Sequence, residues 1–132
     1  MSQALEGKRV LLVDDDADIL TSMQAAFEPT GAVVDTANNG NKAVELAEKN
    51  SPDLVILDMM LPGRSGFLVL EKIKSKKPRG TKPFVIMITG NQGARHKMYA
   101  ESLGVSEYFH KPVKLDKLIA TAERLVAPAA TA

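Results

Sequence analysis

The segment "LLVDDDADIL" (residues 11–20) places three adjacent carboxylates, Asp14, Asp15 and Asp16, directly after an apolar run. A continuous apolar run is typical of a strand that is buried on both faces, as in a parallel sheet. The carboxylates therefore stand where a buried strand is expected to reach the surface. Neighbouring acids are common on solvated surfaces, and Asp16 alone is well placed to cap a following helix.

The same pattern, an apolar run followed by a segment with helical spacing, occurs five times along the chain. Alternating units of this kind predict a doubly wound α/β fold, in which a parallel sheet carries helices on both faces. In the fourth predicted helix, only Ala94, Met98 and Leu103 are candidates for core contacts. The predicted strands are VLLV (10–13), AVV (32–34), LVIL (54–57), FVIMI (84–88) and YF (108–109), and the predicted helices include residues 19–27, 41–49, 66–74, 92–103 and 115–126.

The composition is that of an ordinary globular domain, with 132 residues, 45% hydrophobic and 25% charged. The net charge of +1 gives no global basic field for nucleic acid, and the absence of cysteine excludes disulfides and thiolate metal sites. The first residues lack the apolar core of a signal peptide, and no apolar run approaches the roughly 18 residues that span a bilayer. We expect a cytoplasmic single-domain protein, or a domain excised from a longer protein, that contacts neither membrane nor nucleic acid directly.

Polar residues stand at the ends of four of the five predicted strands. Asp14 and Asp15 end the first strand, Asp58 ends the third in "LVILDMMLPG", Thr89 ends the fourth in "VIMITG", and Lys111 follows the fifth in "YFHKP". The carboxyl ends of parallel strands meet at one edge of the sheet, where ligands of open α/β folds bind. If the first and third strands are neighbours, the three carboxylates converge there.

Converging carboxylates repel one another unless a cation compensates their charge. Lys111 is one candidate cation, and a divalent metal is the other. An all-oxygen site suits Mg²⁺, or Mn²⁺ as an alternative. No histidine or cysteine is placed to favour zinc.

From about Arg9 to Val126 the chain resembles the receiver domain of the two-component response regulators. The resemblance lies in "LLVDDDADIL", "LVILDMMLPGRSG", "VIMITG" and "YFHKPV", in this order and at similar intervals. It implies a five-stranded (βα)5 flavodoxin-like fold with strand order 2-1-3-4-5. Residues 1–8 are then an N-terminal extension, residues 9–126 the receiver domain, and residues 127–132 a flexible C-terminal tail.

The resemblance also implies a phosphorylation site with a metal. Asp58 is the expected phosphoacceptor, and the protein is otherwise no enzyme. Asp15 is expected to bind the metal directly and Asp14 to help through water, while the backbone carbonyl of Met60 supplies a further ligand. Met60 and Asn91 are expected to flank the phosphoryl group. Because Met60 cannot align an attacking water by hydrogen bonding, we expect slow self-dephosphorylation.

The remaining expected roles concern the switch and its partners. Thr89 is expected to bind the phosphoryl group through its hydroxyl, Lys111 to pair with it, and Tyr108 to repack when Thr89 moves. The Lys111–Pro112 bond is expected to be cis. The expected partners are a sensor histidine kinase or histidine phosphotransfer protein, and a downstream protein or second copy that contacts the face formed by residues 92–126.

Three other functions remain open on the sequence alone. A phosphohydrolase of the haloacid dehalogenase type would use the D-x-D patterns in Asp14–Asp18 and needs a substrate-gating cap, but it leaves Asp58 without a role. A flavin mononucleotide module needs a phosphate-binding loop after the first strand, where this chain is acidic. A degenerate receiver that serves only as a docking module is less consistent with the complete set of five polar residues.

Overall fold

The computed structural model describes residues 4–75, 77, 81–90 and 94–127. Strands and helices alternate along the chain, as the apolar pattern predicts. None of the helices in the described part of the chain combines the length and apolar character needed to cross a membrane. The elements are β1 (Arg9–Val13), α1 (Ala17–Phe27), the 3-10 helix η1 (Glu28–Thr30), β2 (Val33–Ala37), α2 (Gly40–Asn50), β3 (Leu54–Asp58), α3 (Gly66–Lys74), β4 (Phe84–Thr89), α4 (Ala94–Ser102), β5 (Glu107–His110) and α5 (Leu115–Val126).

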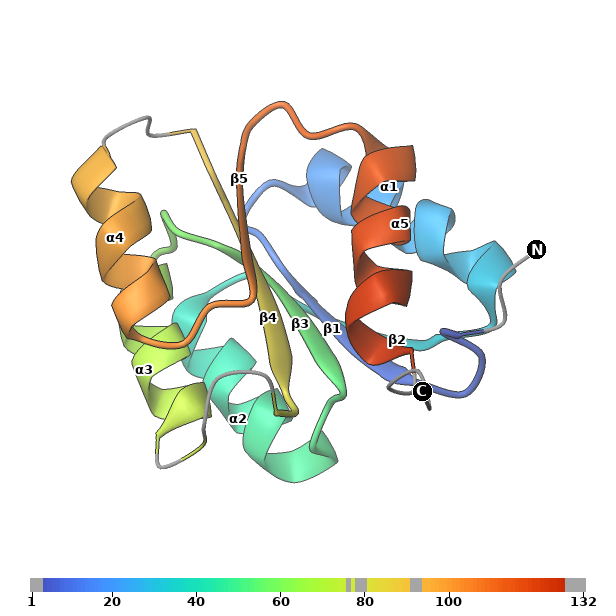
Figure 1. Ribbon diagram of the computed structural model, residues 1–132, viewed down its shortest axis with the longest axis horizontal. Coiled ribbons are helices and arrows are strands. Elements are labelled where there is room, and N and C mark those ends of the chain that lie inside the picture. The colour runs from blue at the N-terminus through green and yellow to red at the C-terminus, as the bar shows by residue number, and fades with distance from the viewer. Residues whose placement is uncertain (1–3, 76, 78–80, 91–93, 128–132) are drawn as a thin grey trace, which may run out of the picture.

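The five strands form one parallel sheet in the order β2-β1-β3-β4-β5. This confirms the strand order that the resemblance implied. Helices α1 and α5 cover one face of the sheet, and α2, α3 and α4 cover the other (Figure 1). All five residues of the central strand β3 are buried, which explains why its sequence is a continuous apolar run.

The sheet separates two apolar cores. The core under α2, α3 and α4 is built on Leu11, Val55, Leu57 and Met87, and the core under α1 and α5 includes Met23, Phe27 and Leu118. The second core also contains Leu5, which is fully buried although it precedes the first strand. Part of the segment expected to be an extension therefore packs into the domain.

Polar caps begin three of the helices where the sequence favours it. The Asp16 carboxylate accepts hydrogen bonds from the backbone N–H groups of Asp18 and Ile19, which confirms its expected capping role. The Asn39 side chain caps α2 in the same way, and the Ser65 hydroxyl caps α3. These caps fix the point at which the chain leaves each strand end and enters the following helix.

Helix α4 differs from the prediction in the residues that it buries. Met98 was predicted to contact the core, but it is 69% exposed, whereas Ala100 is fully buried. Residues two positions apart in an α-helix point about 200° apart around the helix axis. A helix that buries Ala100 therefore turns Met98 to the opposite side. Leu103 is partly buried against the same core, and Ala94 lies at the start of the helix. Helix α4 is therefore anchored by few apolar side chains.

Candidate functional site

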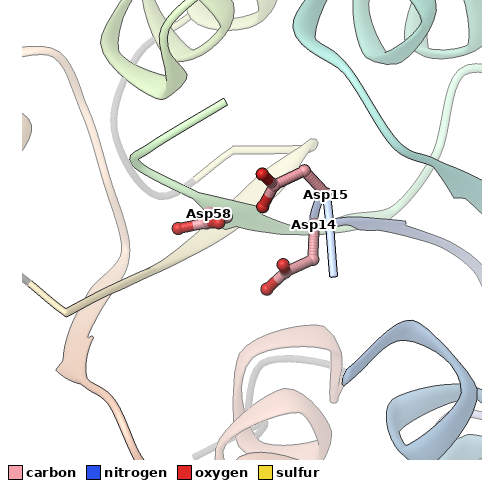
Figure 2. Close-up of side chains that lie close together, drawn as sticks. All are labelled: Asp14, Asp15 and Asp58. Carbon is pink, nitrogen blue, oxygen red and sulfur yellow. The ribbon is translucent and has the colours of Figure 1, made fainter. Parts of the chain in front are cut away.

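Three carboxylates meet at the carboxyl edge of the sheet. Asp14 and Asp15 directly follow β1, Asp58 is the last residue of β3, and these two strands are hydrogen-bonded neighbours. One carboxylate oxygen from each side chain lies within 4.8 Å of those of the other two, as Figure 2 shows. The convergence follows from the strand order, because β1 and β3 pair although they are separated by β2 in the sequence.

Backbone hydrogen bonds hold two of these carboxylate residues, Asp14 and Asp58, in position. The N–H of Asp14 donates to the carbonyl of Ala37 at 3.2 Å, and its Oδ1 accepts from the N–H of Asp16 at 2.9 Å. The Oδ1 of Asp58 accepts from the N–H of Met60 at 3.2 Å. Asp14 and Asp58 are buried, whereas Asp15 is exposed to solvent. Two of the three carboxylates are thus buried and held by backbone hydrogen bonds, and the third is exposed to solvent. We call this group of three carboxylates the pocket.

Gly66, the first residue of α3, lets this helix approach the end of β3. A Cβ atom at Gly66 would lie 2.4 Å from the carbonyl oxygen of Asp58 and 2.6 Å from the Cα of Met59. The Gly66 N–H donates to the Met59 carbonyl at 2.8 Å. Sequence reasoning missed this residue, although a glycine directly after a serine cap and before an apolar helix was a usable signal.

Lys111 is the cation that reaches the pocket. Its Nζ lies 3.1 Å from Oδ2 of Asp14 and 3.3 Å from Oδ2 of Asp58. Its backbone N–H donates to the Thr89 carbonyl at 2.7 Å, which ties the end of β5 to the end of β4. The following bond to Pro112 is cis, as expected. The lysine follows β5 and therefore reaches the acid of β3 from two strands away and the acid of β1 from three.

The charges in the pocket are only partly balanced. Burial raises the pKa of the Asp58 carboxyl, and the charge of Asp14 raises it further against the opposing effects of Lys111 and the Met60 N–H. Burial alone would lower the pKa of Lys111, but its hydrogen bond to Asp14 and the charges of Asp58 and Asp14 outweigh this, so its pKa is raised. Three carboxylates face one lysine among the described residues, which leaves an excess of negative charge.

The donor set fits a hard divalent cation. Carboxylate oxygens are the ligands that Mg²⁺ prefers, and Mg²⁺ commonly keeps several waters and takes only one or two protein carboxylates. The exposed position of Asp15 leaves space for such waters. Besides burial, the charge of Asp14 raises the pKa of Asp58, and a divalent cation at this site would oppose both effects.

The other predicted residues lie around the pocket. Thr89 is completely buried at the end of β4, next to β3 in the sheet. Tyr108 lies on β5, where its half-buried ring packs against the core under α2, α3 and α4. Its hydroxyl is buried without a hydrogen-bond partner in the described part of the chain, and burial raises its pKa. The Met60 side chain is 63% exposed, and Asn91 lies outside the described residues.

An apolar groove of about 350 Å³ opens beside the pocket, between α1 and the segment that joins β5 to α5. Two pocket residues, Asp14 and Lys111, belong to its lining. A helix or loop of another protein that covers this groove is therefore brought next to the carboxylates. The other lining residues are Asp18, Ile19, Ser22, Met23, Ile88, Pro112, Val113 and Leu115.

Comparison with known proteins gives consistent matches along the chain. A family model for the response regulator receiver domain matches residues 10–123. The alkaline phosphatase synthesis transcriptional regulatory protein PhoP of Bacillus subtilis is 34% identical over 105 residues, which are 80% of this chain and 42% of PhoP. The chain therefore spans about two fifths of the length of this curated relative.

Solved structures match the whole fold. A CheY-like response regulator receiver domain protein from Methanospirillum hungatei has a TM-score of 0.82 and 30% identity, over 91% of this chain and 94% of that one. The receiver domain of the Francisella response regulator 1452 has a TM-score of 0.82 and 26% identity, over 91% and 97% of the two chains.

Proposed function

The chain belongs to the family of response regulator receiver domains, and on this basis we propose that it is a phosphorylation-dependent signalling switch. The observation that supports this most directly is the convergence of Asp14, Asp15 and Asp58 with Lys111 at the carboxyl edge of the sheet. Asp58 is the proposed phosphoacceptor. It is the one carboxylate that ends the central strand and also contacts Lys111.

The proposed reaction is transfer of a phosphoryl group to the Asp58 carboxylate. The bond from phosphorus to the donor, a histidine nitrogen or an acyl oxygen, breaks as the bond to an Asp58 oxygen forms. The Lys111 ammonium neutralises charge on the phosphoryl oxygens, and the Thr89 hydroxyl donates a hydrogen bond to one of them. The Met60 N–H already orients the acceptor by its hydrogen bond to Oδ1.

Asp14, Asp15, Asp58 and the Met60 carbonyl are the proposed ligands of Mg²⁺ or Mn²⁺. A bound divalent ion would offset the excess negative charge of the pocket and of the incoming phosphoryl group. In the free protein, Asp14 holds the Lys111 ammonium in place through their 3.1 Å contact. The same acid therefore serves both candidate cations.

The proposed phosphoryl donor is a sensor histidine kinase or a histidine phosphotransfer protein of the cytoplasm. Donor and acceptor have to approach within bonding distance, so part of the donor must cover the surface beside Asp58. The apolar groove between α1 and the β5–α5 segment supports this, because its lining includes Asp14 and Lys111. Apolar surface next to a polar reaction centre suits a docking protein better than a small solute.

The proposed output surface is the face formed by residues 92–126, which includes α4, β5 and α5. A Thr89 side chain that turns towards the phosphoryl group leaves space beside β4. On the neighbouring strand β5, His110 is the partner of Thr89, and Tyr108 lies two residues earlier, opposite Met87, as the large side chain proposed to fill that space. The orphaned Tyr108 hydroxyl supports a second ring position, since a buried donor without a partner is unfavourable. The few apolar anchors of α4 make it the helix that shifts at least cost. A downstream protein or a second copy would read this shift.

The acceptor is tested by intact-mass analysis after incubation with acetyl phosphate and Mg²⁺. The wild-type protein should gain one phosphoryl group, and Asp58→Asn should gain none. Asp53→Asn, at the other end of the same strand, is the matched control and should be labelled like the wild type. Equal labelling of Asp58→Asn would refute the assignment, and turnover of an added phosphate ester would favour a phosphohydrolase.

The output surface is tested by chemical-shift mapping with beryllofluoride, a phosphoryl mimic. Shift changes should extend from the pocket through β5 and α4. Changes that stay in the pocket loops and spare residues 94–110 would contradict the route through Tyr108. The slow self-dephosphorylation proposed from the exposed Met60 side chain is measured in the same purified protein. Loss of the phosphoryl group within seconds would overturn that part of the proposal.

A further inference from the structure

The net charge of the chain conceals a strong local imbalance. Residues 72–82 (KIKSKKPRGTK) contain five lysines and one arginine and no acidic residue. Outside this segment, 11 lysines and arginines face all 16 acidic residues. The sequence therefore joins one short basic segment to a remainder that is acidic on balance, and the described lysines of this segment lie in neither the pocket nor the proposed output face.

Lys74 fixes the basic segment to the body of the domain. This side chain is only 5% exposed. Its Nζ donates to the carbonyl of Thr81 at 2.8 Å and to that of Pro83 at 3.2 Å. The lysine therefore joins the end of α3 to the chain just before β4.

Three exposed lysines of this segment surround one hollow. Lys72, Lys77 and Lys82 line a hollow of about 150 Å³ between the ends of α2 and α3 and the start of β4. We name these three residues the basic rim. The hollow lies at the amino edge of the sheet, at the opposite end of the strands from Asp58. This edge of the sheet is in the lower part of Figure 1.

Like charges crowd one another at this edge. Burial lowers the pKa of Lys74, and the charge of Lys77 lowers it further. Within the described residues, Glu48 also lines the hollow and Asp53 contacts Lys82 at 3.1 Å, so two acids balance part of the charge. Lys72 and Lys77 have no ion pair of this kind among the described residues. A negatively charged group in the hollow would be attracted by both lysines.

We propose that the basic rim binds an acidic segment of a partner protein, with glutamate or aspartate side chains between Lys72 and Lys77. The hollow has the size of one or two side chains. The lysine ammonium is a compact, strongly hydrated charge on a flexible side chain. It can therefore pair with exposed carboxylates in more than one geometry. The binding would be weak and sensitive to salt, as expected for exposed ion pairs.

Two other anionic partners fit the surroundings less well. Glu45 and Glu48 border Lys72 on α2, and Glu71 borders it on α3, so the continuous phosphates of a nucleic acid would meet acids on both sides. None of the large apolar side chains that are exposed in the described part of the chain lines this hollow, and Leu68 on α3 lies outside it, one helical turn before Lys72. The hollow therefore presents neither a ring for stacking on a base nor an anchor for a lipid bilayer.

The test uses a fluorescein-labelled octaglutamate peptide and the unphosphorylated protein, with binding followed by anisotropy at low ionic strength. Lys72→Gln/Lys77→Gln should weaken binding about five-fold, the effect expected from losing two exposed ion pairs. Lys42→Gln/Lys114→Gln removes the same charge from exposed positions outside the hollow and should weaken binding less than two-fold, that is about 0.4 kcal/mol or less. The Asp58→Asn protein should bind like the wild type, so the result does not depend on the proposed phosphorylation.

Three results would overturn the proposal. One is equal weakening by the two double variants, which would reflect net charge alone. Another is the absence of peptide binding to the wild type at low ionic strength. The third is tighter binding of a DNA duplex, or of vesicles that contain phosphatidylserine, lost in the Lys72→Gln/Lys77→Gln variant. Circular dichroism spectra identical to the wild type would confirm that both variants fold.

Discussion

The two edges of the sheet each collect charges of one sign, but they hold them in different ways. At the carboxyl edge, Asp14 and Asp58 are buried and share Lys111 within 3.3 Å. At the amino edge, Lys74 is the one buried lysine among the described residues, while the lysines of the basic rim are exposed around a hollow. At both edges burial favours the neutral form of the buried group: it raises the pKa of Asp58 and lowers the pKa of Lys74.

This difference indicates what each edge can bind. Three carboxylates whose oxygens lie within 4.8 Å of one another define a single point, which suits a small ion and a phosphoryl group. Lysines spread over a helix end and a connecting segment define an area, which suits a flexible acidic chain. A parallel sheet produces both kinds of site. Its carboxyl edge collects residues from the segments that follow the strands, and its amino edge collects residues from the segments that precede them.

The largest expected effect concerns the backbone contact beneath the acidic pocket. Gly66→Ala places a methyl group against the Asp58 carbonyl and should destabilise the protein by about 2–3 kcal/mol, as steric strain at a buried backbone position does. Phosphoryl labelling of the folded fraction should also slow. Gly90→Ala is the matched control, because nothing lies within 4 Å of its added Cβ. Urea denaturation measures both, and equal stability losses would contradict the special role of Gly66.

The second prediction exchanges the key lysine of each edge for methionine. Lys74→Met leaves the carbonyls of Thr81 and Pro83 without this donor and should cost about 2 kcal/mol without changing acetyl phosphate labelling. Lys111→Met should instead reduce labelling strongly, because the phosphoryl oxygens lose their lysine. Denaturation and intact-mass analysis of the two variants test the contrast. Equal labelling of both would remove the proposed role of Lys111.

The third prediction concerns metal binding. Mg²⁺ at ten times its Kd should stabilise the protein by about 1.4 kcal/mol through mass action. Asp15→Asn should lose most of this gain, whereas Asp53→Asn at the amino edge should keep it. Thermal melts with and without the metal measure the difference. A melting temperature that ignores millimolar Mg²⁺ would argue against a metal site at the carboxyl edge.

The smallest expected effect concerns pH. Because the pKa of Asp58 is raised in the folded state, its charged form destabilises the metal-free protein at neutral pH. Asp58→Asn should therefore be more stable than the wild type at pH 7. The difference should shrink as the pH falls through the raised pKa and Asp58 becomes neutral. Melting curves without metal test the sign, and a difference that grows towards acid pH would contradict it.

The residue pattern predicted the carboxyl edge better than any other part of the molecule. Continuous apolar runs identified the strands, and Asp58 stands at the end of one of them. Parallel strands then bring such residues to one edge by geometry alone. The residue pattern did not predict that β1 and β3 are neighbours, because strand order depends on connections that periodicity does not encode. That expectation came from the family resemblance.

Helix α4 and the basic segment show where pattern reading failed. In α4, methionine was taken as the apolar anchor, but the fully buried residue is Ala100, whose small side chain gives little periodic signal. At the amino edge, the overall charge of +1 hid a run of six cations. The burial of Lys74 was not predictable, because its two carbonyl partners come from a segment that follows the helix.

The burial of Leu5 has a consequence for how the chain folds as it leaves the ribosome. Leu5 shares its core with Leu118, Ala122 and Val126, so residues from both ends of the domain complete one cluster. The core under α2, α3 and α4 contains no residue beyond Val105 among its buried members and can form earlier. During synthesis, one side of the sheet can therefore be completed first, and the cluster that contains Leu5 stays incomplete until the last helix emerges.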